Sequence, residues 1–118
     1  MAVRFTYWLP KSLSLGDSPG DDKHKNQTRL VAREIPIGEQ MNVADALSGA
    51  KLMHELGSRM LVEVDGIPVT PENKDEVWHR FNAKQRDLMF KLYRRLHVVE
   101  EADVESFFAS EGVVASEG

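Results

Sequence analysis

The histidines of this sequence do not follow a metal-binding spacing. There are four, His24, His54, His79 and His97, and no two stand at the i, i+4 spacing of an H-E-x-x-H helix. The chain has no cysteine, which excludes a thiolate ligand. We therefore expect no metal site, and we interpret the histidines as residues of the surface or of helix edges.

Catalytic motifs are also missing. The acidic pairs Asp21-Asp22 and Glu100-Glu101 are adjacent in the sequence, whereas acid–base catalysis needs two groups held in different environments across a cleft. The sequence has no phosphate-binding G-x-x-x-x-G-K-[ST] or G-x-G-x-x-G motif and no G-x-S-x-G nucleophile elbow. We therefore expect no catalytic residues, no cofactor and no enzyme activity.

Basic residues gather on one face of a predicted helix near the C-terminal end of the sequence. At about 100° per residue, this face holds Arg80, Lys84, Lys91, Arg94 and Arg95. One interpretation is a helix that binds nucleic acid, and the other is a solvated face of an ordinary amphipathic helix. Asp87 interrupts the face and the net charge is −4; both facts favour the solvated face, because nucleic-acid-binding domains are usually basic.

Two large apolar side chains fall outside the predicted apolar faces. Phe90 lies beside the main helical stripe, and Trp8 lies on the opposite side of its strand from Tyr7 and Leu9. Such residues indicate either a surface that binds a partner or, for Phe90, contact with a second cluster formed by Phe107 and Phe108. Both interpretations stay open at this point.

The N-terminal third predicts strands and turns. Apolar residues alternate over 3–9, which is strand periodicity, and Pro10 ends the run. A short strand over 12–15 follows, and then a polar, turn-rich segment over 16–27 that we interpret as a mobile loop at the tip of a hairpin. Residues 28–37 are extended again.

The middle of the sequence predicts a helix followed by a small hairpin. The helix begins either at Asn42 as N-cap or near Gly38, and Gly57 is its predicted C-terminal cap. Gly49 lies inside this helix, where it weakens the helix and allows close packing. A short strand over 60–64, the turn Asp65-Gly66 and a returning segment over 67–69 follow.

The last third predicts helices. Thr70-Pro71 is a start signal for a helix to about Phe81. Asn82 with Gln85 resembles a capping box, so a second helix should run to about His97; the alternative is one helix over 71–97. A last helix over 100–110 and a flexible tail over 111–118 complete the prediction.

Length and composition set the class of protein. With 118 residues, 42% hydrophobic and 29% charged, we expect one α+β domain over 1–110, in which a small N-terminal antiparallel hairpin or sheet packs against three or four helices. No apolar run approaches the roughly 18 residues of a membrane span, and the first ten residues lack the apolar core of a signal peptide. The absence of cysteine fits a reducing compartment.

Three segments together resemble a known family. Residues 29–47 (RLVAREIPIGEQMNVADAL), 60–69 (MLVEVDGIPV) and 77–93 (VWHRFNAKQRDLMFKLY) follow the strand–helix–turn–helix order of the tail assembly chaperones of long-tailed bacteriophages, including the Mu-like group. The likeness covers about residues 28–110. It implies a small protein of the host bacterial cytoplasm that coats the helical tape-measure protein before the tail tube polymerises, and many such chaperones also have a frameshift-extended form.

Because the family carries no catalytic residues, none are transferred. Binding to the tape-measure protein or another phage tail protein would use a helix-in-groove mode with aromatic and Met anchors. The candidate partner-binding residues are Met53, Trp78, Met89, Phe90, Tyr93, Phe107 and Phe108. A homo-oligomer is left open. The alternative functions are a structural tail or baseplate protein retained in the virion, and a small nucleic-acid-associated regulator that uses the basic face.

Overall fold

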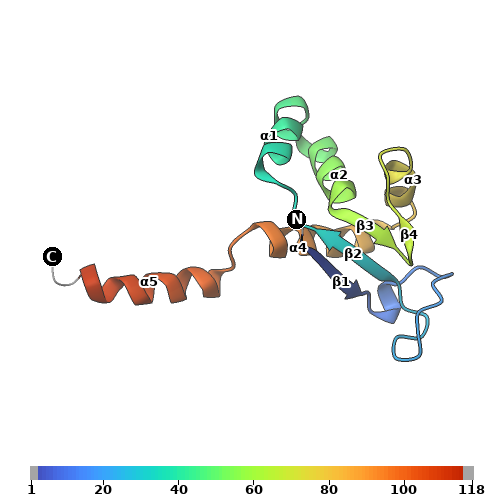
Figure 1. Cartoon of the computed structure of the whole chain (residues 1–118), viewed down its shortest axis with the longest axis horizontal. Coiled ribbons are helices and arrows are strands. Elements are labelled where there is room, and N and C mark those ends of the chain that lie inside the picture. The colour runs from blue at the N-terminus through green and yellow to red at the C-terminus, as the bar shows by residue number, and fades with distance from the viewer. Residues whose placement is uncertain (1–2, 116–118) are drawn as a thin grey trace.

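The fold is α+β, as predicted. A computed structural model describes residues 3–115 of the chain, with side chains as far as Ser110. The elements in chain order are β1 (Arg4–Trp8), the 3-10 helix η1 (Lys11–Leu13), β2 (Arg29–Arg33), α1 (Ile37–Ala46), α2 (Gly49–Met60), β3 (Leu61–Val64), β4 (Ile67–Pro68), α3 (Lys74–His79), α4 (Ala83–His97) and α5 (Glu101–Ala115). In Figure 1, α1, α2 and α3 stand on one side of the sheet and α4 crosses behind the strands.

The four strands form one antiparallel sheet in the order β1-β2-β3-β4. The predicted N-terminal hairpin is confirmed, with Arg4 opposite Arg33 and Trp8 opposite Arg29. The predicted strand over 12–15 is wrong, because η1 lies there. Pro10 has no N–H for a ladder, and its carbonyl accepts from the Leu13 N–H at 2.9 Å, which closes a turn instead.

The predicted single helix in the middle of the chain is two helices. The chain is extended at Leu47 and Ser48, and Gly49 has φ +61°. A residue with a side chain adopts this conformation only at a cost, so Gly49 marks the junction between α1 and α2 rather than a close contact. The start at Asn42 is also wrong, since α1 begins directly after Pro36 with Glu39 in its first turn.

The close approach that the sequence assigned to Gly49 occurs at Gly57 instead. Gly57 is buried inside α2 rather than at its C-terminal cap. A Cβ placed on Gly57 would lie 2.5 Å from the Cη2 atom of Trp78. The indole of Trp78 in α3 therefore packs directly against the backbone of α2 at Gly57, where a side chain would collide with it.

The C-terminal helices follow the predicted breaks closely. Helix α3 begins three residues later than predicted, because Thr70 and Asn73 exchange side-chain and backbone hydrogen bonds of 2.7 and 3.3 Å in a turn. The capping box is confirmed: the Gln85 N–H donates to Asn82 Oδ1 at 2.9 Å, and the Asn82 N–H donates to Gln85 Oε1 at 2.7 Å. The alternative of one helix over 71–97 is therefore wrong.

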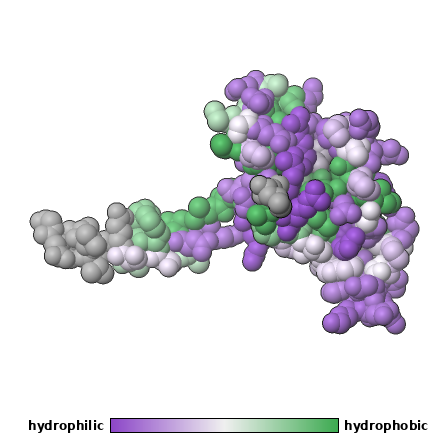
Figure 2. All heavy atoms as spheres, in the orientation of Figure 1, coloured by the Kyte–Doolittle hydropathy of each residue, from purple (hydrophilic) through white to green (hydrophobic). Residues whose placement is uncertain are grey.

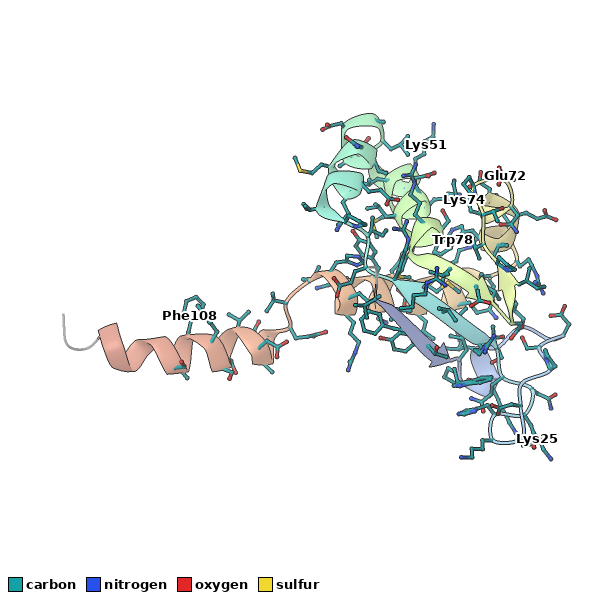
Figure 3. All side chains as sticks on the ribbon, viewed as in Figure 1. Lys25, Lys51, Glu72, Lys74, Trp78 and Phe108 are labelled. Atoms are coloured by element: carbon teal, nitrogen blue, oxygen red, sulfur yellow. The ribbon has the colours of Figure 1, made fainter. Side chains whose placement is uncertain are left out.

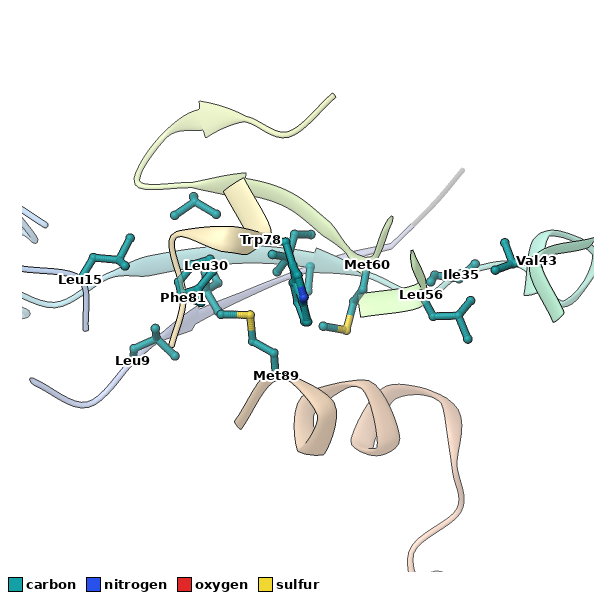
Figure 4. Close-up of a cluster of buried hydrophobic side chains, with 13 residues drawn as sticks. Leu9, Leu15, Leu30, Ile35, Val43, Leu56, Met60, Trp78, Phe81 and Met89 are labelled. Carbon is teal, nitrogen blue, oxygen red and sulfur yellow. The ribbon is translucent and has the colours of Figure 1, made fainter. Parts of the chain in front are cut away.

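The core lies between the sheet and the helices α2, α3 and α4. Its largest fully buried side chains are Trp78, Phe81, Leu30, Met60 and Met89. Figure 4 shows Met89 rising from α4 toward Phe81, with Met60 beside Trp78. Elements far apart in the sequence thus share one apolar interior.

Helix α5 extends away from the rest of the molecule (Figure 1). The molecule measures 60 × 39 × 30 Å along its principal axes, and α5 accounts for the long dimension. The helix runs to Ala115, beyond its predicted end at Ser110; of the predicted tail over 111–118, residues 116–118 lie outside the described residues. None of the helices described here has the length and hydropathy required to cross a lipid bilayer.

Candidate protein-binding groove

An apolar groove of about 480 Å³ lies between the edge strand β1 and helix α4. We call it the β1–α4 groove. Its wall on the strand side is formed by Tyr7, Trp8, Leu9, Pro10 and Leu30, and its wall on the helix side by Leu88, Met89, Lys91, Leu92, Arg95 and Glu100.

The sequence places apolar side chains on both walls for local reasons. The alternation over β1 directs Tyr7 and Leu9 to one side of the strand, and Leu9 is buried. On α4, residues 88, 89 and 92 recur at helical spacing and form the apolar stripe. Met89 closes the floor of the groove, while Leu88 and Leu92 stay half-buried.

The β1–α4 groove continues along α4 toward its N-terminal end. A neighbouring hollow of about 510 Å³ is lined by Leu13, Ala83, Lys84, Asp87, Leu88 and Lys91. The two hollows share Leu88 and Lys91. From Ala83 to Arg95 the helix rises roughly 18 Å at 1.5 Å per residue, which is long enough to receive several turns of another helix.

The rim of the groove is mostly cationic. Lys91 and Arg95 line it and are exposed, and Lys84 lines the continuation. Lys91 donates to Asp87 Oδ2 at 2.9 Å, but both side chains are more than 60% exposed, so this pair contributes little to stability. Among the described residues, neither Lys84 nor Arg95 has an ion-pair partner.

The predicted basic face is divided by the fold. Arg80 lies at the end of α3 and donates to both carboxylate oxygens of Asp17 at 3.0 Å. Lys84, Lys91, Arg94 and Arg95 remain together on α4 and are exposed. Three of these four cations, Lys84, Lys91 and Arg95, line the groove or its continuation, and Arg94 does not. Asp87 lies among them on α4.

The candidate partner-binding residues separate into three groups by burial: two are core, three are half-buried and two are exposed. Trp78 and Met89 are 2% and 0% exposed, so they belong to the core, and Met89 also lines the floor of the β1–α4 groove. Met53, Phe90 and Tyr93 are half-buried. The sequence pattern did not separate these roles, because core and surface apolar residues recur at the same helical spacing.

Tyr93 holds α4 against α1. Its hydroxyl donates to Gln40 Oε1 at 2.6 Å, and Gln40 Nε2 donates to the Ile35 carbonyl at 2.8 Å. Burial raises the pKa of Tyr93 above its ordinary value. One helical turn later, His97 Nε2 accepts from the Ile35 N–H at 2.8 Å, which requires a neutral imidazole whose Nδ1–H donates to the Tyr93 carbonyl. Tyr93 is thus engaged within the protein.

Phe107 and Phe108 are exposed on α5, at 63% and 58%. Their rings meet edge to face at 5.2 Å. Phe90 instead contacts Trp78, with ring centroids 5.6 Å apart, so the predicted cluster of Phe90 with Phe107 and Phe108 is wrong. Figure 3 shows Trp78 inside the body of the protein and Phe108 far from it on α5.

Trp8, which the strand pattern had singled out, is part of the groove. It is half-buried, and its indole stacks on the imidazole of His24 with centroids 4.2 Å apart and planes 2° from parallel. The contact joins β1 to the 16–27 loop. On the strand side of this groove, the signal in the sequence was a tryptophan outside the apolar face of its strand.

A buried hydrogen-bond network that the sequence analysis missed holds the start of the same loop. Ser18 Oγ donates to Asp65 Oδ2 at 2.7 Å and lies 2.6 Å from Thr28 Oγ1, which accepts from the Leu15 N–H at 2.8 Å. Asp65 Oδ1 accepts from the Arg29 N–H at 2.9 Å. The loop is therefore tied to the sheet at Ser18, and its mobility elsewhere stays a prediction.

A second groove, of about 370 Å³, is charged and lies between β2, α2 and α3. Three of the four cations that line it are paired with carboxylates, whereas Arg4 has no ion pair among the described residues. Arg33 donates to both oxygens of Glu39 at 3.1 and 2.9 Å, Arg59 donates to Glu55 at 2.6 Å, and Lys74 donates to Glu55 at 3.0 Å. This ion-pair network joins four elements, and its carboxylates occupy donors of Arg33, Arg59 and Lys74.

The network shifts the pKa of its carboxylates downward. Hydrogen bonds from Arg33, opposed by burial and supported by Arg59, lower the pKa of Glu39. Burial raises the pKa of Glu55, but the hydrogen bonds from Arg59 and Lys74 outweigh it and the net shift is downward. Both groups are thus ionised and structural at neutral pH.

Comparison with known proteins supplies no relative. The chain matches no protein-family model, no curated protein and no solved structure. Among residues 3–115, no group of three or more His, Asp or Glu side chains is placed to hold a metal ion. What the chain does must therefore be inferred from its own surface, whose two conspicuous apolar features are the β1–α4 groove and α5.

Proposed function

We propose that this chain is a tail assembly chaperone of a long-tailed bacteriophage, which binds the tape-measure protein during tail morphogenesis and keeps it soluble without catalysis. The observation that carries the proposal is the β1–α4 groove, an apolar trough beside a helix with cations along its rim. An amphipathic helix that lays its apolar face into such a trough is a recurring mode of recognition.

The chemistry of the groove suits a long helical client. Half-buried Trp8 and Leu92 offer apolar contact, and the exposed cations Lys91 and Arg95 select segments with acidic residues beside their apolar face. These contacts involve no group that must transfer a proton or an electron pair.

The proposal is tested by co-expression with a phage tape-measure protein. We expect the two to co-purify and the tape-measure protein to become soluble. Trp8→Ala removes the indole from the groove and should reduce the recovered client, whereas Met41→Ala, which removes another exposed apolar side chain on α1, should leave recovery unchanged. The circular dichroism spectrum of each variant checks that it is folded.

Failure of the client to co-purify, together with the presence of this chain in purified virions by mass spectrometry, would contradict the chaperone role and favour a structural role in the tail or baseplate. The remaining alternative, a nucleic-acid-associated regulator, draws on the exposed cations Lys84, Arg94 and Arg95. It requires DNA binding that weakens steeply as salt increases, and the chaperone proposal expects no such binding.

A further inference from the structure

Helix α5 carries an apolar face that nothing in the described structure covers. All of residues 101–110 are exposed, and Val99, Val104, Phe107 and Phe108 are between 36% and 67% exposed. In Figure 2 hydrophobic surface runs along one side of α5 and its connection to the body. Because an isolated helix of 15 residues is only marginally stable in water, α5 needs a surface to pack against.

The β1–α4 groove has the dimensions for this helix. A helix of 15 residues is roughly 22 Å long, and the groove with its continuation follows α4 for roughly 18 Å. The groove has apolar walls and α5 has exposed apolar side chains, so their contact would remove both from water.

The charges of the two surfaces are complementary. Residues 96–118 contain no Lys or Arg, and α5 has Glu101 and Asp103 in its first turn, followed by Glu105. The rim of the groove has Lys91 and Arg95 with Glu100 at its end, and the continuation adds Lys84 and Asp87, so cations outnumber acids three to two. Opposite charges along an apolar contact fix its register and orientation.

The complementarity extends to the order of residues. Side chains at i, i+3, i+4 and i+7 share one face of a helix. On α4 this face reads Leu88, Lys91, Leu92 and Arg95; on α5 it reads Glu101, Val104, Glu105 and Phe108. Antiparallel alignment of the two places Leu88 opposite Phe108, Lys91 opposite Glu105, Leu92 opposite Val104 and Arg95 opposite Glu101.

We propose that the β1–α4 groove of each copy of this chain is occupied by α5 of a second copy, so that two copies exchange their C-terminal helices in a symmetric dimer. Such an exchange is isologous, since each chain gives one helix and receives one, and both apolar surfaces are covered. The inference does not require a phage client; where one exists, α5 occupies the groove until the client displaces it.

The hinge between α4 and α5 favours exchange over closure within one chain. It consists of residues 98–100, and Val98 is extended at φ −124° and ψ 132°. Val98 and Val99 are β-branched residues that prefer extended backbone, and the hinge contains none of the Gly, Pro, Asn, Asp or Ser residues that tight turns use. An extended hinge leads α5 away from its own groove, as Figure 1 shows.

A charge-exchange experiment tests the dimer. The first variant reverses the rim of the groove with Lys91→Glu and Arg95→Glu, and the second reverses the helix with Glu101→Lys and Glu105→Lys. By analytical ultracentrifugation the unaltered chain should be a dimer, and each variant alone should dissociate with a Kd raised at least about tenfold, since 1.4 kcal/mol of lost interaction is tenfold in Kd.

Mixing the two variants restores opposite charges at both grooves, so a heterodimer should form with nearly the original Kd. The control Lys25→Glu with Lys51→Glu changes the net charge by the same amount as the groove variant, at exposed positions on the loop and on α2 (Figure 3). This control should remain dimeric.

Phe107→Ser with Phe108→Ser provides a second, uncharged disruption, which should also give a monomer with an unchanged circular dichroism spectrum for the body. A chain that is monomeric at every concentration, a dimer that survives the Phe107 and Phe108 changes, or a mixture that forms no heterodimer would each overturn the proposal. A monomer whose stability responds to the charge variants would mean closure within one chain. The ultracentrifugation experiment contains no client protein, so it tests the dimer alone. A chain that forms this dimer but fails to bind the client in the co-expression test would contradict only the proposed function.

Discussion

Two phenylalanines of this protein differ completely in burial. Phe81 is 1% exposed and lies in the core, while Phe107 is 63% exposed on α5. Helices α4 and α5 show the same contrast although they have the same length of 15 residues. Helix α4 begins with a capping box, ends with basic residues and sends Met89 into the core, whereas residues 101–110 of α5 are exposed throughout.

The comparison teaches that burial in this chain depends on neighbours far along the sequence. Phe81 meets residues from β2 and α4, and those partners exist within the chain. Phe107 has the ring of Phe108 beside it and is otherwise exposed. A difference in stability between the two regions should therefore appear when each is mutated.

The largest expected effect is at Trp78. Trp78→Ala removes a side chain that is 2% exposed and leaves a cavity between α2, α3 and α4, which should lower the free energy of unfolding by about 3–5 kcal/mol. Urea denaturation followed by circular dichroism measures it. An effect below about 1 kcal/mol would mean that the body is not held together by this cluster.

The next effect comes from the contact of Gly57 with Trp78. Gly57→Ala would place Cβ 2.5 Å from the indole, and because the ring is enclosed, we expect a loss of about 2–3 kcal/mol from overpacking. The matched control is Gly38→Ala in α1, where nothing lies within 4 Å. This control should be neutral or stabilise by up to about 1 kcal/mol, since Ala is the better helix former.

Thr28→Val tests the buried network at the start of the loop. The side chain keeps its shape but leaves the Leu15 N–H and Ser18 without the partner that they have now at 2.8 and 2.6 Å. We expect a loss of about 1–2 kcal/mol in thermal or urea unfolding. An unchanged midpoint would show that water replaces the hydroxyl there.

A smaller effect depends on pH. Because the pKa values of Glu39 and Glu55 are lowered on folding from an ordinary value of 4.5, their contribution to stability is present above about that pH and is lost as the pH falls through the folded-state pKa values. The free energy of unfolding, measured by urea titration at a series of pH values, should therefore decrease as the pH falls below about 4.5. Glu55→Gln should lower stability at neutral pH by about 1 kcal/mol and flatten this acid limb.

The smallest effect is expected on α5. Phe107→Ala with Phe108→Ala should change the unfolding free energy of the dilute, monomeric chain by less than about 0.5 kcal/mol, because the two rings touch no residue of the body. The comparison becomes sharper at high concentration, where the same variant should lose the rise in midpoint that dimerisation gives. A large loss in dilute solution would place α5 against the body.

Much of the fold could be predicted because its signals are local. The capping box at Asn82 and Gln85, the turn at Asp65-Gly66 and the alternation over β1 each depend on residues a few positions apart. The errors arose where a local signal had two meanings. A glycine inside a helical pattern indicates either a cap or a close contact, and the pattern assigned these roles to Gly57 and Gly49 in the reverse order.

The candidate site was less predictable than the fold. Seven apolar residues were proposed as partner contacts, and of these Phe107 and Phe108 are exposed while Trp78 and Met89 are core. The groove itself needs Tyr7 and Leu92, which are far apart in the sequence. On the strand side, Trp8 was the groove residue that the sequence singled out, because it lies outside the apolar face of its strand.

The sequence alone determined the α+β class, the N-terminal hairpin and the break before α4, since these follow from backbone preferences and from hydrogen bonds between near neighbours. Only the tertiary structure decided which apolar side chains are covered, which glycine admits the indole of Trp78, and that β1 and α4 leave a groove between them. Burial is a property of segments brought together from distant positions, and periodicity records which face of an element is apolar without recording what lies against it.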